Sequence, residues 1–134
     1  MFKGIILRLR RGERGQDMIE FALLAPILLL LIMGIVDFGR VFNSYLVTTH
    51  GAREGARYAA VGYSDGEIVN QVQATTGGLT VSVGVAGSRV QGQPMSVTVS
   101  TSVPLLTGMI ANFFLQNPFP LTSTAEMRYE GPKI

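Results

Sequence analysis

The sequence predicts an α+β protein: a long N-terminal helix that includes a membrane span, then a small C-terminal head of three antiparallel strands and short helices. Three observations support this fold class. Residues 21–36 form an uncharged run, and helical periodicity continues beyond it to about Val61. Three later segments alternate apolar and polar side chains, as strands do in a sheet buried on one face. The expected regions are a basic leader at 1–15, a long helix at 16–62 and the head at 63–134.

Composition and charge narrow the class of protein. Charged residues make up 15% of the chain, below the roughly 25% of soluble domains, and there is no cysteine to form disulfides or thiolate sites. Residues 1–15 carry a net charge of +4, whereas the rest carries −2. A basic arm can bind nucleic acid, but Lys and Arg directly before an apolar run favour a cytoplasmic membrane flank. The basic side chains of this arm are Lys3, Arg8, Arg10, Arg11 and Arg14, opposed by Glu13.

The uncharged run at 21–36 is the predicted core of the membrane span, which flanking apolar residues extend to about 18–38. As a helix the run covers about 24 Å, slightly less than a hydrocarbon core. A buried core helix and a cleaved secretory signal are the alternatives. A signal ends at a small-x-small site, which the following MGIVDFGRVF does not offer. Three helix-breaking residues lie within or beside the span: Pro26, Gly34 and Gly39. They either produce a local bend or are tolerated in a regular membrane helix.

Helical spacing continues past the span, so one helix is predicted from about Asp17 to Val61. Small side chains line its later part, and they allow another backbone to approach closely. A helix of this length requires a packing partner along it. The proposed helix-packing residues are Gly51, Ala52, Gly55, Ala56 and Ala59.

The head is predicted to begin with a short helix capped by Ser64 and Glu67 and ended by the glycine pair 77–78. Alternating segments follow at 79–85, 95–103 and 119–130. Between the last two, apolar residues keep helical spacing at Leu106, Met109, Ile110, Phe113 and Phe114. Because a head this small is marginally stable alone, it is expected to lean on the long helix.

The most informative motif lies at the start of the long helix. Gly15 follows the basic arm, and Glu20 stands five residues later, inside the apolar helix. An acidic side chain at the centre of a membrane helix costs about 2.5–3.5 kcal/mol, so its presence requires a reason. Glu20 either serves assembly or lies at the interface and extends toward water, as Asp17 is expected to do.

The Gly-x-x-x-x-Glu pattern is the site that type IV pilin-like proteins present to prepilin peptidase. The segment RGERGQDMIEFALLAPILLLLIMGIVDFGRVF, followed by THGAREGARYAA, resembles the TadE-like family of Tad pilus biogenesis proteins over residues 11–60. AEMRYE, at 125–130, is more weakly similar to the C-terminal end of that family.

The resemblance implies cleavage after Gly15 on the cytoplasmic side, which makes Gln16 the new N-terminus. It also implies that the Gln16 amine of one subunit pairs with Glu20 of its neighbour, since pairing offsets part of the cost of each charge. The residues expected to act in assembly are therefore Gln16, Glu20 and Phe21. The main Tad pilins have Glu-Tyr here and are very short, so the large head favours a minor subunit.

Charged side chains that follow the small residues are candidates for salt bridges between subunits, or simply a solvated face: Arg53, Glu54 and Arg57. His50 is the single histidine and is expected on a polar helix face. The acids lack metal-ligand spacing and no phosphate-binding loop is present, so no catalytic, metal or cofactor site is expected and the chain is not predicted to be an enzyme.

Three functions remain open: a minor pilin or pseudopilin of a Tad-type pilus, a membrane-resident assembly factor that is never polymerised, and the main subunit of a filament. Expected partners are other pilin or pseudopilin subunits in a homo- or hetero-oligomer, a prepilin peptidase, the inner-membrane assembly platform and membrane lipid, but not nucleic acid. The expected location is a bacterial inner membrane, with the head outside the cytoplasm, and then the pilus.

Overall fold

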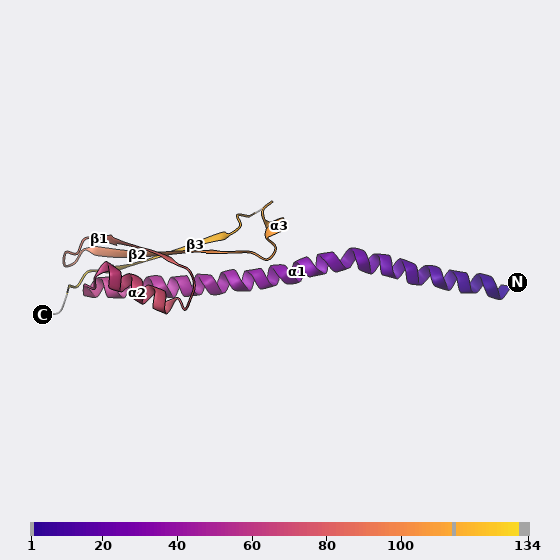
Figure 1. Cartoon of the computed structure of the whole chain (residues 1–134), viewed down its shortest axis with the longest axis horizontal. Helices are drawn as coiled ribbons and strands as arrows, with labels where there is room; N and C mark the ends of the chain where they lie inside the picture. Colours follow the sequence, from indigo (N-terminus) through magenta and orange to yellow (C-terminus); the bar gives the residue numbers. More distant parts are fainter. Residues whose placement is uncertain (1, 114, 132–134) are drawn as a thin grey trace. The chain divides into compact units, whose positions relative to one another are not determined.

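The computed structural model describes the backbone of residues 2–113 and 115–131, and the side chains of residues 15–131 except 109, 111 and 114. The described elements follow in the order α1, α2, β1, β2, α3 and β3 (Figure 1). The chain divides into two compact units, Met1–Val36 and Asp37–Ile134, and each is described by itself. The α+β class is confirmed by a long apolar helix and a three-stranded antiparallel sheet.

The helix α1, Phe2–Val61, begins well before the predicted start near Asp17. Residues 2–16 contain no proline, and their Lys, Leu, Arg, Glu and Gln residues favour a helix although three glycines in the segment oppose it. It continues without a break through Pro26, Gly34 and Gly39.

The helix ends where predicted, because Gly62 adopts a left-handed conformation with φ 96°. The Gly62 N–H donates to the Ala59 carbonyl at 3.2 Å, and the Tyr63 N–H donates to the Tyr58 carbonyl at 3.2 Å. The Tyr58 and Tyr63 rings lie 4.7 Å apart, which adds an apolar contact across the helix end. These bonds form a Schellman motif, in which glycine takes the backbone angle that other residues avoid.

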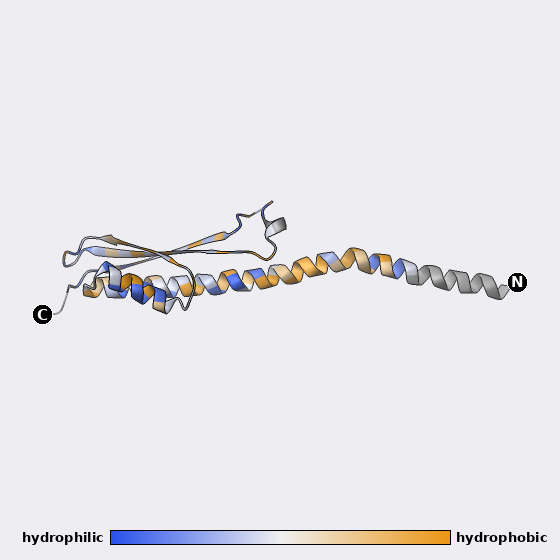
Figure 2. Ribbon diagram, in the orientation of Figure 1, coloured by the Kyte–Doolittle hydropathy of each residue, from blue (hydrophilic) through white to orange (hydrophobic). Residues whose placement is uncertain are grey.

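In the first unit, the described residues form the N-terminal part of α1, and its apolar side chains are exposed. The exposed residues include Phe21, Leu28 and Ile32, and Figure 2 shows this part of α1 as a continuous apolar stretch. The helix is long and apolar enough to cross a membrane, and none of its most apolar stretch is buried. This surface fits membrane anchoring because a water-soluble helix would bury such a face.

The second unit contains the predicted capped helix, α2, at Asp65–Thr75. The Ser64 hydroxyl accepts from the Glu67 N–H, and the Glu67 carboxylate accepts from the Ser64 N–H at 2.9 Å. The capping box is therefore confirmed. Ile68 and Val72 are the buried residues of this helix.

The sheet has the strand order β1-β2-β3, with β1 at Ser82–Gly87, β2 at Pro94–Val103 and β3 at Phe119–Arg128. Antiparallel pairing places Val85 opposite Val97 and Val97 opposite Ala125. The alternation identified all three strands, although β1 begins later than predicted. Met127, near the end of the edge strand β3, is exposed although its partner Met95 on β2 is buried.

The core of the second unit lies between α1, α2 and β2. Its buried members come from all three elements and from no other strand: Ala52, Ala56, Ala59, Ile68, Val72, Met95, Val97 and Val99. The Glu130 N–H also donates to the Ala60 carbonyl at 2.9 Å, which ties the segment after β3 to the end of α1. The head thus packs on the long helix, as its small size predicted.

Between β2 and β3, the predicted helix is a single turn, α3, at Gly108–Ala111. The helical spacing expected through Phe113 is not followed, because Phe113 lies beyond the turn. Met109 and Phe114 fall outside the described side chains. Figure 1 shows α3 at one end of the sheet and α2 toward the other.

Candidate functional site

A carboxylate on α1 holds the connection between β2 and β3. Asp37 Oδ1 accepts from the Leu106 N–H at 2.8 Å, and Oδ2 accepts from the Thr107 N–H at 2.9 Å and the Thr107 hydroxyl at 2.7 Å. The Asp37 residue is only 5% exposed. Arg40, one turn later on α1, lies 3.7 Å from Oδ1. We call Asp37, Leu106 and Thr107 the Asp37 clasp.

The clasp satisfies a buried charge with three donors, which is what a carboxylate requires when it leaves water. Its effect is to fix residues 106–107 to α1 at the position directly after Val36, the last residue of the uncharged run. Asp37 was not among the residues that the sequence predicted to form a site. An isolated acid at the end of an apolar run was the available signal, but its partner lies 69 positions away and nothing in one sequence identifies it.

The N-terminal motif is displayed on the surface of α1. Gly15, Gln16, Glu20 and Phe21 are all exposed and helical. A carboxylate and a large aromatic ring on an exposed apolar helix are available to lipid or to another protein. The roles of these four residues in processing and assembly remain predictions.

The small residues of α1 pack against the head of the same chain. A Cβ on Gly55 would lie 2.7 Å from Val72 Cγ2 and 2.9 Å from Val97 Cγ1, and a Cβ on Gly51 would lie 3.0 Å from Thr76 Cγ2. Ala52, Ala56 and Ala59 are buried in the core. Within the chain, these small residues therefore lie against side chains of α2 and β2. Packing against another subunit remains a prediction.

The predicted salt-bridge residues are only partly joined within the chain. Arg57 Nη2 lies 3.3 Å from Glu54 Oε1, one helical turn away. Arg53 is exposed on the same helix, and so is His50. Salt bridges from Arg53, Glu54 or Arg57 to another subunit remain a prediction.

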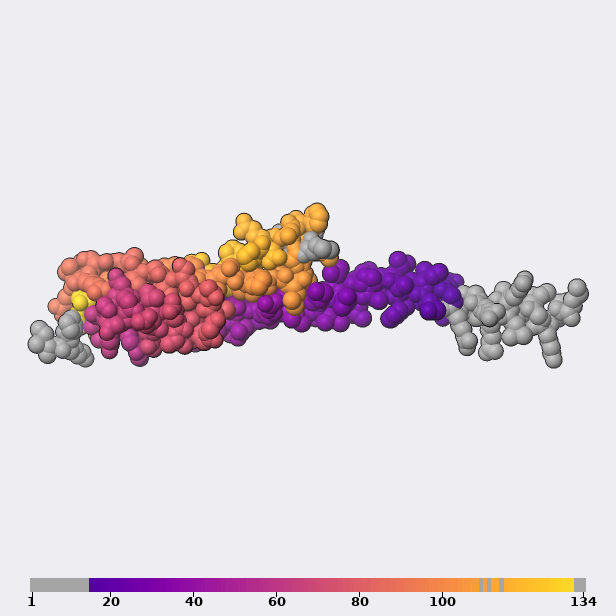
Figure 3. Space-filling view, viewed as in Figure 1, coloured from indigo at the N-terminus to yellow at the C-terminus, as the bar shows by residue number. Residues whose placement is uncertain are grey.

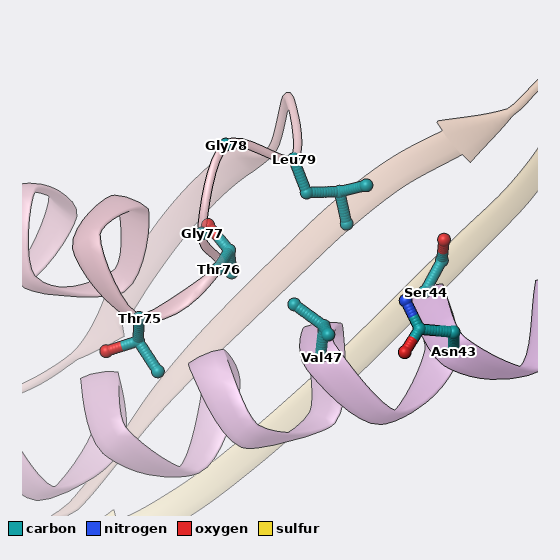
Figure 4. Close-up of a pocket in the computed structure, with 8 residues that line it drawn as sticks. All are labelled: Asn43, Ser44, Val47, Thr75, Thr76, Gly77, Gly78 and Leu79. Carbon is teal, nitrogen blue, oxygen red and sulfur yellow. The ribbon is translucent and has the colours of Figure 1, made fainter. Parts of the chain in front are cut away.

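A shallow pocket of about 410 Å³ lies between α1 and the turn that follows α2 (Figure 4). Val47 and Leu79 face it from opposite sides, with Ser44 and Asn43 at one end. Its lining contains no charged side chain. Among the described residues, no cluster of His, Asp or Glu is placed to hold a metal ion. The pocket is a packing feature of the head and offers few groups that could orient a ligand.

A family model described as TadE-like protein matches residues 15–57. The match begins at Gly15, contains the exposed Glu20 and the buried Asp37, and ends at Arg57. This segment is TadE-like. The resemblance seen in the sequence is thereby confirmed. Searches of curated proteins and of solved structures found no match.

The TadE-like segment includes nearly all of α1 after Gly15, and thus both the exposed apolar surface and the small residues that hold the head. The match to the TadE-like family supports involvement in the Tad pilus, and the members of that family are structural proteins rather than enzymes. The apolar helix fits membrane anchoring, and the TadE-like family suggests that the partners are pilus-associated proteins.

Proposed function

We propose that this chain is a minor pilin-like subunit of a Tad-type pilus, anchored in the inner membrane by α1 and assembled into the filament through it. The observation that carries the proposal is the exposed Gln16–Glu20 segment at the start of the TadE-like match. Cleavage after Gly15 creates an amine at Gln16. A neighbour's Glu20 can neutralise that amine in the apolar filament core, where an unpaired charge is costly.

The head supports a minor role. It forms a buried core that uses the C-terminal third of α1, so this part of the helix is covered within one chain. The apolar side chains of α1 before Asp37 are exposed, and theirs is the surface that lipid covers first and other subunits cover after assembly. The +4 arm directs residues 1–15 to the cytoplasm and the head outside it.

The test is to analyse sheared filaments and membranes from cells that express the full chain together with a prepilin peptidase. We expect a small amount of the chain in filaments, with Gln16 as its first residue by mass spectrometry. Detection as the most abundant filament protein would instead identify the main subunit. Its presence in membranes and complete absence from filaments would identify a membrane-resident assembly factor.

The topology is tested separately with reporter fusions after Ile134. A reporter that is active only outside the cytoplasm is expected. Activity only in the cytoplasm would reverse the assignment, and with it the location of the cleavage site.

A further inference from the structure

The connection between β2 and β3, residues 104–118, is an apolar loop with no charged side chain. Four of its described apolar side chains are between 44% and 83% exposed: Leu106, Ile110, Phe113 and Leu115. A set of exposed apolar side chains on one loop indicates a surface that binds a membrane or another protein. The loop is also long enough that an ordered structure points to a function.

Hydrogen bonds within the loop order its backbone. Asn117 Oδ1 accepts from the Leu105 N–H at 3.1 Å and closes the base of the loop. Gly108 lies against the Asn117 amide, so a larger side chain has no room there. The α3 turn satisfies further backbone groups, including the Ile110 N–H, which donates to the Thr107 carbonyl at 2.9 Å. The apolar side chains are therefore presented on a structured support.

The Asp37 clasp fixes where this loop lies on α1. Leu106 and Thr107 bond to the residue directly after Val36, at the end of the apolar run, and Figure 3 shows this part of the chain against α1. Phe38 and Phe42 are exposed on the same part of α1, with their rings stacked 6.1 Å apart. The loop is thus attached to the residue that directly follows the uncharged run in the sequence.

We propose that the 104–118 loop inserts its apolar side chains into the membrane surface, so that the head is held on the bilayer by a second contact besides α1. The inference rests on the proposed membrane anchoring through α1. Lipid is the occupant that the position favours, because the clasp places a charge-free loop at the end of a membrane span. Interfacial segments bury Phe and Leu in the same way, about 5–10 Å into the headgroup region.

The experiment uses the full chain in lipid nanodiscs, and the absence of cysteine allows single labels without other changes. Spin labels are placed by Asn112→Cys on the loop, Ile27→Cys in the span and Ser88→Cys in the connection between β1 and β2. Asn112 is exposed and its replacement keeps every apolar loop residue. Depth is measured from collisions with oxygen, which concentrates in lipid, and with a water-soluble nickel complex.

We expect the Ile27 label in the hydrocarbon, the Asn112 label within about 10 Å below the headgroups, and the Ser88 label in water. A water-exposed Asn112 label beside a lipid-exposed Ile27 label would overturn the loop insertion and leave the anchoring intact. A water-exposed Ile27 label would overturn the anchoring itself. An Asn112 label shielded from both reagents only at high protein-to-lipid ratio would show that a second copy covers the loop, and would overturn the lipid assignment.

Discussion

The carboxylate of Asp37 on α1 accepts hydrogen bonds from both the backbone N–H and the hydroxyl of Thr107, at 2.9 and 2.7 Å, across 70 positions of sequence. This contact, with the Leu106 bond beside it, connects the loop after β2 to the helix at the end of the apolar run. It is separate from the apolar core around Ile68 and Val97. The Asp37 clasp, the apolar core and the bond between Glu130 and Ala60 therefore all join the head to α1.

Removing the Asp37 carboxylate should release the loop while leaving the core folded. Asp37→Ala leaves the Leu106 and Thr107 donors without partners, and bonds to a charged acceptor contribute about 1.5–3 kcal/mol each. Asp37→Asn restores the bonds only in part, since the amide nitrogen faces a donor. Hydrogen exchange of the full chain in nanodiscs should show faster exchange at residues 106–107, with β2 unchanged.

Arg40→Ala is the control for the Asp37 variants. The Arg40 side chain is 42% exposed and 3.7 Å from Asp37, so its loss should change stability by at most about 1 kcal/mol. Unchanged exchange at Leu106 and Thr107 in Asp37→Ala would contradict the role given to the carboxylate.

Gly55 should tolerate no larger side chain, because a Cβ there would lie within 2.9 Å of both Val72 and Val97 side chains. Gly55→Val should destabilise the head by about 1–3 kcal/mol through overpacking. Gly39→Val is the matched control, since no such atom lies within 4 Å of a Cβ at that position of the same helix. Denaturant titration of both variants in detergent, followed by circular dichroism, compares them. Equal stabilities would show that the packing around Gly55 is loose.

The capping box of Ser64 and Glu67 should stabilise the N-terminus of α2 less at acidic pH. The Ser64 hydroxyl and then the Ser64 N–H donate to the Glu67 carboxylate and lower its pKa below the ordinary value. The unfolded segment therefore binds a proton more readily than the folded one. The stabilisation is present above the ordinary carboxyl range and is lost as pH falls through the lower folded pKa.

An NMR titration of the Ser64 and Glu67 amides from neutral pH to about pH 3 follows this loss, which begins below the ordinary Glu pKa of about 4.3. Glu67→Gln should flatten the titration at both amides. A transition of the same size in Glu67→Gln would assign the pH dependence to another group.

The sequence predicted those parts of the fold that depend on local patterns. The apolar run, the Ser64–Glu67 box and the three alternating segments each specify an element from neighbouring residues. Gly62 likewise marked the end of α1 correctly. Local patterns identified the small residues on α1, but not that side chains of α2 and β2 from the same chain lie against them.

The clasp and the loop it holds could not be predicted from local patterns. Asp37 and Thr107 are joined only by the tertiary fold, and the spacing of Leu106, Ile110 and Phe113 suggested a longer helix than the single turn of α3. Gly108 and the bond between Asn117 and Leu105 limit that turn. A loop closed by its own side chains has no periodicity to detect.

Glu20 should be needed for assembly and not for folding, insertion or cleavage. It is exposed on α1 in the first unit, outside the core of the head, so Glu20→Gln should leave head stability unchanged. Removing the charge should make insertion easier, because a buried carboxylate costs about 2.5–3.5 kcal/mol in the span. In the proposed filament, however, the substitution would leave a neighbour's Gln16 amine unpaired, at a cost of roughly 3–5 kcal/mol.

Each 1.36 kcal/mol is a tenfold change in an equilibrium, so an unpaired amine at this cost should reduce incorporation of Glu20→Gln into sheared filaments by at least about a hundredfold. Asp17→Asn is the matched control: it removes an exposed acid three positions earlier on the same helix and should be incorporated normally. Quantitative mass spectrometry of filaments and membranes gives the ratio for each variant. The informative quantity is the difference in filament incorporation between the Glu20 and Asp17 variants. Equal incorporation of both variants would leave Glu20 as an interface residue, whereas equal loss would point to the total charge of the segment rather than to a pair with Gln16.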